Sequence, residues 1–336
     1  MVFNGRLRLW ETFYRQNHET GWETLKHIIL DTDPGVDDAL AFLLAFASPG
    51  LKVEAVTTVA GNVSHGKGHR NAKQLLEFLG RTDVPVCRGA ETPLVRALRH
   101  AEGVHGETGL GGASLPEPRM KSDHRSAVQV IHEKAEELGG DLTLVAVGPL
   151  TNVAAALNAD PTLPTKVNGL VMMGGAYGLT PYGYGNVSPV AEFNVWHDPE
   201  AAKIVFNSGI PMVCAGLDTT THPDYRMSVE TFRKIEAMDT RRSRLVADLC
   251  SDIVERFEGF NLHDPMAVAY LADPTIFKTR RCKVNVETCG ELTRGMTVVE
   301  RRHGRIVEAD TEIIVEIDAE RFHRLIMERV VEGRDG

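Results

Sequence analysis

The alternation of short apolar runs with helical segments, which begins at residue 27, is the feature that most constrains the fold. The run His27–Asp31 has the composition of a strand buried on both faces, and Pro34 and Gly35 end it. The pattern predicts further strands over 53–59, 142–147, 170–173 and 211–217, and helices over 39–47, 71–79, 150–157 and 199–206. Strands that alternate with helices form right-handed parallel βαβ units, so we predict an α/β fold with a mostly parallel, doubly wound, Rossmann-like sheet.

The C-terminal third of the chain predicts extra helices and a small strand group. Helices are expected over 242–257, 265–271 and 319–331, and the strands of the small group over 283–286, 296–299 and 312–315. No linker or repeat divides this part of the chain from the rest. We therefore expect a single domain over 25–336, preceded by an N-terminal extension over 1–24.

The composition argues against several classes of protein. A formal net charge of -9 disfavours a nucleic-acid partner, because binding a phosphate backbone needs a basic face. No apolar run approaches the roughly 20 residues of a membrane span. The five cysteines are scattered and form no C-x-x-C, so we expect neither a disulfide framework nor a thiolate zinc site, and a reducing compartment fits. These features predict a cytoplasmic protein without a nucleic-acid or membrane partner.

Four aspartates, Asp31, Asp33, Asp37 and Asp38, follow or end the first predicted strand. Pro34 keeps Asp33 extended at the strand tip, and Asp37 and Asp38 fall in the first turn of the next helix, where negative charge is favoured. Adjacent helical residues point roughly 100° apart, so one can face a metal and the other a ligand hydroxyl. Such a cluster repels itself unless a cation lies within it. Hard oxygen ligands favour Ca²⁺ or Mg²⁺, and flexible carboxylates with a main-chain carbonyl favour Ca²⁺.

Three alternative roles fit this aspartate cluster less well. A helix cap or turn accounts for single aspartates but not for the whole set. An EF-hand loop that starts at Asp31 requires Gly at its sixth position and Glu at its twelfth, where this chain has Val36 and Phe42. A phosphatase that forms an aspartyl phosphate begins with a similar Asp-x-Asp, but Thr or Val is expected where Gly35 stands.

The segment Gly61–Lys67 matches most of a phosphate-binding P-loop. The motif then requires Ser or Thr, and the chain has Gly68, so a P-loop is disfavoured. Asn62 remains a candidate as a loop amide at the carboxyl end of a strand, where ligands bind in such sheets. His65 and His69 share a helix face but lack the Glu of the zinc-protease pattern, so we expect surface histidines.

Later loops carry polar groups that suit a sugar. Asn186 and the segment 192–194 place two amides and a carboxylate around an aromatic ring, which suits a polyhydroxylated ligand on an apolar floor, although a structural role is an equal alternative. The glycine-rich residues 105–112 form either a plain surface loop or a lid. Met173 either fills space in the hydrophobic core or forms part of the floor of the site. Asp264 begins a helix, where it is either an N-cap or a ligand.

Taken together, these segments resemble the inosine–uridine-preferring nucleoside hydrolase family. The segments that carry the resemblance are 31–39, 60–62, 105–106, 108–110, 147–152, 173–176, 191–194 and 263–264, and they span most of the chain from residue 27 onward. The resemblance implies an enzyme that hydrolyses the N-glycosidic bond of ribonucleosides to free base and ribose. It further implies a Ca²⁺ cofactor and a homodimer or homotetramer.

The resemblance also implies roles for single residues. Ca²⁺ would be bound by Asp33, Asp38, Asp264 and the main-chain carbonyl of Val147. Asp33 would also take a proton from a Ca²⁺-bound water, and His263 would protonate the departing base. Asp37, Asn62 and Asn194 would bind the 2′- and 3′-hydroxyls of the sugar, and Asn186 and Glu192 would bind its 5′-hydroxyl. Met173 and Phe193 would line the underside of the sugar. His105 would lie near the site.

The chemistry of the reaction agrees with these residue types. Cleavage of a ribosyl C–N bond passes through an oxocarbenium-like state, so water must be activated, the sugar cation stabilised and the base made a better leaving group. Three alternatives stay open: a hydrolase of a modified nucleoside or another N-riboside, a phosphatase or P-loop nucleotide enzyme, and a non-catalytic Ca²⁺-dependent sugar-binding protein. The base preference also stays open, because residues 178–185, with Pro181, Tyr182 and Tyr184, depart from the family pattern in length.

Overall fold

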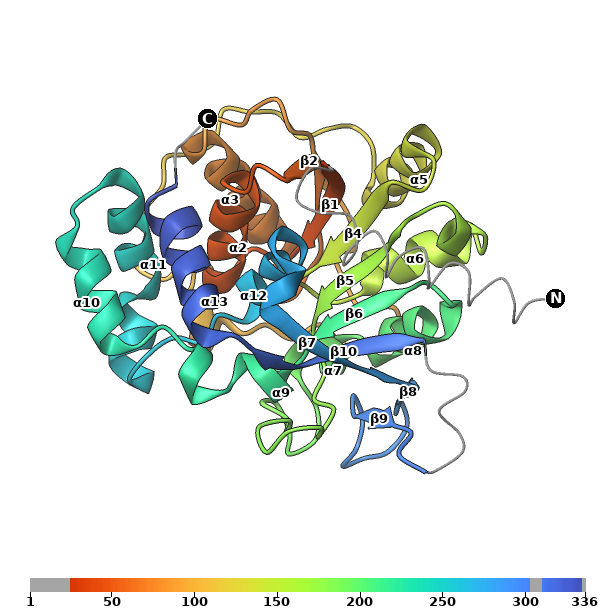
Figure 1. Cartoon of the computed structure of the whole chain (residues 1–336). Helices are drawn as coiled ribbons and strands as arrows, with labels where there is room; N and C mark the ends of the chain where they lie inside the picture. Colours follow the sequence, from red (N-terminus) through yellow and green to blue (C-terminus); the bar gives the residue numbers. More distant parts are fainter. Residues whose placement is uncertain (1–24, 303–309, 334–336) are drawn as a thin grey trace.

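A computed structural model describes residues 25–302 and 310–333, so the predicted extension over 1–24 lies outside the described residues. Eight strands form the central sheet in the order β3-β2-β1-β4-β5-β6-β10-β7 (Figure 1). The strands are β1 (Lys26–Thr32), β2 (Leu51–Thr58), β3 (Val86–Arg88), β4 (Leu142–Ala146), β5 (Gly169–Met173), β6 (Met212–Ala215), β7 (Phe277–Cys282) and β10 (Thr311–Ile317). All neighbours are parallel except β10 and β7, which confirms the predicted α/β fold.

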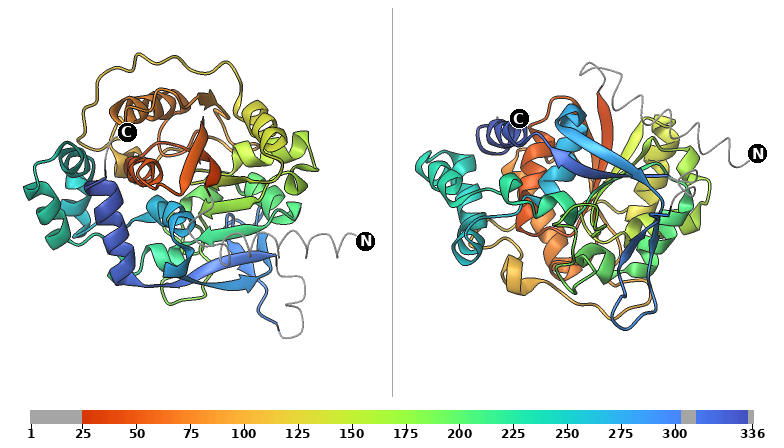
Figure 2. Two further views of the ribbon diagram at one scale, coloured as in Figure 1. Left: turned by 45° about the horizontal axis from the view of Figure 1, so that its top comes forward. Right: turned by 60° about the horizontal axis from the view of Figure 1, so that its bottom comes forward.

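Helices cover both faces of the sheet (Figure 2). One face packs against α2 (Val36–Phe46), α3 (His65–Phe78), α11 (Arg241–Phe257), α12 (His263–Ala272) and α13 (Ala319–Ile326). The other packs against α5 (Ala127–Leu138), α6 (Thr151–Ala159) and α8 (Pro199–Ser208). Within β1, Ile28 and Leu30 belong to the first core and Ile29 to the second, as the two-residue period of a strand requires. In the described part of the chain, no helix has the length and apolarity needed to cross a membrane.

The predicted C-terminal strand group is divided between two sheets. Only β8 (Val284–Val286) and β9 (Thr297–Val299) form the small antiparallel sheet. The third strand, β10, lies in the main sheet between β6 and β7. There Ile313 and Ile314 are fully buried and pack into the cores on the two opposite faces of the sheet. The sequence pattern also did not predict several elements, namely β3, β7, α4 (Glu102–His105), α5, α7 (Phe193–His197), α9 (Leu217–Thr220) and α10 (Val229–Ala237).

The strand order creates a crevice beside β1. The chain passes from β1 through β2 to β3 at one edge and then returns to β4 on the other side of β1. The connections after β1 and β4 therefore leave the sheet in opposite directions, and ligands of such folds bind at this switch point, beyond the carboxyl ends of the strands. Asp33 follows β1 and Val147 follows β4, so the strongest sequence signal lies where the fold provides a site.

Candidate active site

A cavity of about 630 Å³ opens at the switch point. All of the predicted site residues except Asp33 and Asp38 line it. The lining residues come from many elements: Asp37 from α2, Asn62 after β2, His105 from α4, Val147 after β4, Met173 at the end of β5, Asn186 and Glu192 before α7, Phe193 and Asn194 from α7, and His263 and Asp264 from α12. Residues that lie more than two hundred positions apart in the sequence, such as Asp37 and Asp264, thus line one cavity.

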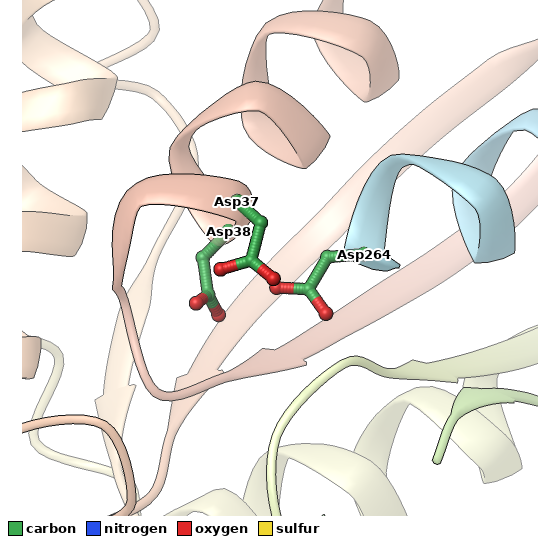
Figure 3. Close-up of side chains that lie close together, drawn as sticks. All are labelled: Asp37, Asp38 and Asp264. Carbon is green, nitrogen blue, oxygen red and sulfur yellow. The ribbon is translucent and has the colours of Figure 1, made fainter. Parts of the chain in front are cut away.

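The deepest part of the site is a carboxylate cluster. Asp37 and Asp38 lie in the first turn of α2, Asp264 lies in the first turn of α12, and their carboxylates face one another (Figure 3). One oxygen from each of the three lies within 4.8 Å of the others. Both helices direct their positive N-terminal ends at the cluster, which favours negative charge there. Asp264 therefore belongs to the carboxylate cluster, and the N-cap of α12 is Leu262.

Asp33 and Asp38 lie directly behind the cavity wall and are held by hydrogen bonds. Asp38 accepts from the main-chain N–H of Gly35 (2.8 Å) and from the Asn62 side-chain amide (3.0 Å). Asp33 accepts from the main-chain N–H of Asn62 at 2.7 Å. Gly61 permits this approach, because a Cβ at that position would come within 1.9 Å of an Asp33 carboxylate oxygen. The loop after β2 therefore fixes both aspartates.

Burial makes negative charge costly throughout the cluster. Asp33, Asp37, Asp38 and Asp264 are each at most 6 % exposed. Burial raises the pKa of all four carboxyls, and repulsion from neighbouring aspartates raises the pKa of Asp33, Asp37 and Asp264 further. No Lys or Arg of the described chain forms an ion pair with any of them. A cation among them would remove this cost.

The donor atoms fit a hard divalent cation. One oxygen of Asp33 (Oδ1) and one of Asp37 (Oδ1) are buried without a hydrogen-bond partner. The Val147 carbonyl accepts from the Asn194 amide at 2.8 Å and keeps a second lone pair. Carboxylate and carbonyl oxygens are the ligands that Ca²⁺ and Mg²⁺ prefer. The three converging carboxylates are those of Asp38 and Asp264, which were predicted as ligands, and of Asp37, which was predicted to bind the sugar; Asp33, the other predicted carboxylate ligand, is not in this group of three.

Two histidines face the cavity above the cluster. His105 accepts from the Val36 main-chain N–H through Nδ1 (3.2 Å), which leaves the proton on Nε2. His263 shares a hydrogen bond with the Thr220 hydroxyl through Nδ1 (2.8 Å), so its Nε2 is available to a ligand. Burial lowers the pKa of both imidazoles to about 4. Repulsion from His263 lowers the pKa of His105 further, and repulsion from Arg226 does the same for His263. Both imidazoles are therefore neutral near pH 7.

The wall predicted to bind the sugar is rigidly built. Both carboxylate oxygens of Glu192 accept main-chain N–H groups, from Gly175 (2.8 Å) and from Asn194 (2.9 Å). The Asn194 amide donates to the Val147 and Met173 carbonyls, so its own oxygen is free to accept. Glu192 thus has a structural role in addition to its position on the cavity wall.

Several lining residues carry no signal that the sequence analysis detected. Arg226, Phe257 and Phe260 border the cavity on the side of His263, and Arg99 and Trp196 border it near α7. The predicted surface position of His65 and His69 was wrong. They are 3 % and 1 % exposed, and each shares a hydrogen bond with the Thr58 hydroxyl at 3.0 Å.

Comparison with known proteins agrees with this geometry. The model of the inosine-uridine preferring nucleoside hydrolase family matches residues 28–324. The chain belongs to that family. The pyrimidine-specific ribonucleoside hydrolase RihA of Escherichia coli O7:K1 (strain IAI39 / ExPEC) is 43% identical over 310 residues, which cover 90% of this chain and 97% of that protein.

Solved structures extend the comparison to three dimensions. A purine-preferring ribonucleoside hydrolase from Gardnerella vaginalis is 31% identical with a TM-score of 0.84, covering 91% of this chain and 98% of its own. A plant nucleoside hydrolase, the PpNRh1 enzyme, is 33% identical with a TM-score of 0.82, covering 91% and 99%. The predictions of family and enzyme class are confirmed: the chain is a nucleoside hydrolase, which is an N-glycosidase.

Proposed function

We propose that the chain hydrolyses the N-glycosidic bond of pyrimidine ribonucleosides with a bound Ca²⁺. The observation that carries the proposal is the buried cluster of Asp37, Asp38 and Asp264, with Asp33 held nearby by the Asn62 main chain, beside a cavity of a size that suits a nucleoside. The preference for pyrimidines is supported by the RihA relatives, which are named pyrimidine-specific and match 90% of the chain. The purine-preferring neighbour is less similar, at 31% identity.

The residues divide the reaction between them. Asp33, Asp38, Asp264 and the Val147 carbonyl would hold Ca²⁺, which supplies positive charge that orients and acidifies water. Asp33 accepts a proton from the attacking water, because its free Oδ1 is a buried carboxylate oxygen with a raised pKa. Asp37, Asn62 and Asn194 bind the 2′- and 3′-hydroxyls, and Asn186 and Glu192 bind the 5′-hydroxyl. Clustered carboxylates then stabilise the sugar as it becomes cationic.

The opposite side of the cavity suits the leaving base. Phe257 and Phe260 offer apolar faces to a planar ring, and His263 and Arg226 offer polar donors. The Arg226 guanidinium donates to the Phe257 carbonyl at 2.9 Å and keeps a buried Nε without a partner. We infer that the neutral His263 gives its Nε2 proton to the departing base, and that the proton lost by the attacking water returns to the imidazole before the next turnover. Arg226 stabilises the negative charge that develops on the base oxygens.

The rival functions have less support. In the P-loop-like segment, Lys67 donates to Glu102 (2.9 Å) and to the Glu107 carbonyl (2.7 Å), so its amine is engaged away from any phosphate. Hydrolysis of a modified nucleoside or another N-riboside remains the alternative nearest in chemistry. A non-catalytic sugar-binding protein would bind ribose without turnover.

Release of reducing ribose from a panel of purine and pyrimidine ribonucleosides tests the proposal. We expect turnover of uridine and cytidine that requires Ca²⁺ and is lost in Asp33→Asn. An exposed aspartate, Asp141, provides the matched control, and Asp141→Asn should retain wild-type rates. Binding without turnover, or phosphate release from phosphoesters in place of ribose release, would refute the proposal.

A further inference from the structure

The hydrogen bond between Thr220 and His263 is the contact through which another part of the fold holds the candidate acid. The Thr220 hydroxyl and the Nδ1 atom of His263 lie 2.8 Å apart. Within residues 25–302 and 310–333, this is the one hydrogen bond that the His263 imidazole forms. Its own helix does not hold the ring, since His263 is the first residue of α12 and the N-cap, Leu262, provides no side-chain cap. The second torsion of a histidine side chain is soft, so a contact from another element sets the rotation of the ring.

The direction of this hydrogen bond follows from the burial of Thr220. Thr220 is fully buried, and Nδ1 of His263 is the one partner of its hydroxyl among the residues that the structure describes. A buried hydroxyl whose proton has no acceptor costs free energy, because it has lost its hydrogen bond with water. The Thr220 O–H therefore donates to Nδ1. A neutral imidazole has one N–H and one bare nitrogen, so a hydrogen bond accepted at Nδ1 leaves the proton on Nε2.

Thr220 is held in place by α9 and by the segment that follows β5. Its main-chain N–H donates to the Gly216 carbonyl at 3.1 Å. Asp218, two residues earlier in α9, is fully buried, and its carboxylate accepts from the main-chain N–H groups of Tyr177 (2.7 Å) and Leu179 (2.6 Å). These contacts fix the position of the Thr220 hydroxyl from outside α12.

We propose that Thr220 is a positioning residue, which orients the His263 imidazole and keeps the transferable proton on Nε2. The inference rests on the proposed function. As the C1′–N bond breaks, the Nε2–H bond also breaks and its proton moves to the base. Negative charge then builds up on the ring, so Nδ1 becomes a stronger acceptor and the hydrogen bond from Thr220 strengthens. The proton released by the attacking water returns to Nε2 before the next turnover. Thr220 does not line the cavity, so it acts on the substrate through His263.

Parallel assays of Thr220→Val with uridine and p-nitrophenyl riboside test the inference in the Ca²⁺-loaded full chain. The substitution removes the hydroxyl and keeps the branched shape of the side chain. Because the lost hydrogen bond is stronger in the transition state, kcat and kcat/KM for uridine should fall together by about 10- to 100-fold, the range for a hydrogen bond to a charged group, with KM unchanged. The rate on p-nitrophenyl riboside should fall by less than about three-fold, because its leaving group needs no proton.

Neighbouring and conservative substitutions provide the controls. Thr220→Ser keeps the hydroxyl and should restore uridine turnover to within about three-fold of the wild type. Thr219→Val is the matched control, since Thr219 is equally buried in α9 but its hydroxyl donates to the Gly216 carbonyl (3.4 Å), and both substrates should keep wild-type rates. Should Thr220→Val fail to fold in thermal unfolding, Thr220→Cys supplies a second variant of similar size. Its S–H is a weak donor, so we expect an intermediate loss on uridine alone.

A double-mutant cycle separates positioning from a purely structural role. In the His263→Ala background, Thr220→Val should reduce uridine turnover by less than about two-fold further, because the residue on which Thr220 acts is absent. A further loss as large as in the wild-type background overturns the inference, and so do equal losses on the two substrates in Thr220→Val.

The same assays distinguish failure of the inference from failure of the proposed function. A loss confined to uridine in His263→Ala, without such a loss in Thr220→Val, overturns the inference and leaves the proposed function intact. A wild type that releases no ribose from uridine, or equal losses on both substrates in His263→Ala, overturns the proposed function, and the inference falls with it.

Discussion

Removal of the divalent cation should destabilise the folded chain, and Asp264→Asn should abolish this response. The reason lies in the cluster of Asp37, Asp38 and Asp264, whose oxygens lie within 4.8 Å of one another and whose side chains are buried. At an effective dielectric constant of about 20, two unit charges at that distance repel by about 3 kcal/mol. A bound cation converts this repulsion into attraction.

The size of the effect follows from mass action. At a Ca²⁺ concentration of 100 Kd, binding to the folded state alone adds about 2.7 kcal/mol to the free energy of unfolding, and at 1,000 Kd about 4.1 kcal/mol. A folded part of about 300 residues has an unfolding entropy near 0.6 kcal/mol/K. Wild-type Tm should therefore rise by about 4–7 °C between chelated and Ca²⁺-saturated protein.

The variant separates metal binding from general stability. Asp264→Asn removes a ligand and also a repelling charge, so its Tm under chelation should equal or exceed that of the wild type, while Ca²⁺ should move it by less than about 1 °C. Thermal unfolding followed by circular dichroism measures both quantities, with Asp141→Asn as the control at an exposed site. A Ca²⁺ shift in Asp264→Asn as large as that of the wild type would refute metal binding by this cluster.

Three further predictions concern catalysis and stability. His263→Ala should lose about 10²–10⁴-fold in rate on natural nucleosides but little on a p-nitrophenyl riboside, whose leaving group needs no proton, so equal losses would contradict its role as acid. Wild-type kcat/KM should favour ribonucleosides over 2′-deoxyribonucleosides by about 10²–10⁴-fold, and Asp37→Ala should shrink that ratio; an unchanged ratio would argue against the placement of the sugar. Burial raises the pKa of Glu54, but hydrogen bonds from Lys52, His27 and Lys134 outweigh it and lower that pKa to about 2. The stabilisation that Glu54 gives the folded state is therefore present above pH 4.5 and is lost as pH falls toward 2. Glu54→Gln should lower the free energy of unfolding at pH 7 by about 2–3 kcal/mol and by little at pH 2, as chemical denaturation at the two pH values would measure.

The parts of the fold and site that could be predicted from the sequence are those with local causes. Pro34 and Gly35 end β1 and start α2 through backbone preferences that act over a few residues, so the position of Asp33, Asp37 and Asp38 follows from the segment itself. Short runs of apolar residues predicted β1 and β4, and these runs are also local features of the sequence. The carboxyl ends of parallel strands share one edge of the sheet, so the loops after them meet there.

Other features depend on contacts between distant segments. β10 was assigned to the small sheet because a short apolar strand does not specify its neighbour, and its place between β6 and β7 follows only from packing of the two cores. His65 and His69 carry a polar pattern on α3, yet Thr58 and the Ser122 hydroxyl supply hydrogen bonds that make their burial tolerable. No residue type along α3 signals those partners.

The arginines at the two ends of the cavity illustrate why net charge could not describe the site. The chain is acidic overall, and the floor of the cavity is acidic, but Arg226 lies on the side of His263 and Arg99 on the side of α7. Such an arrangement orients a substrate whose sugar becomes cationic over the carboxylates, while negative charge develops on the departing base beside Arg226. Opposed local charges of this kind cancel in composition, and they act separately because each faces a different atom of one bound ligand.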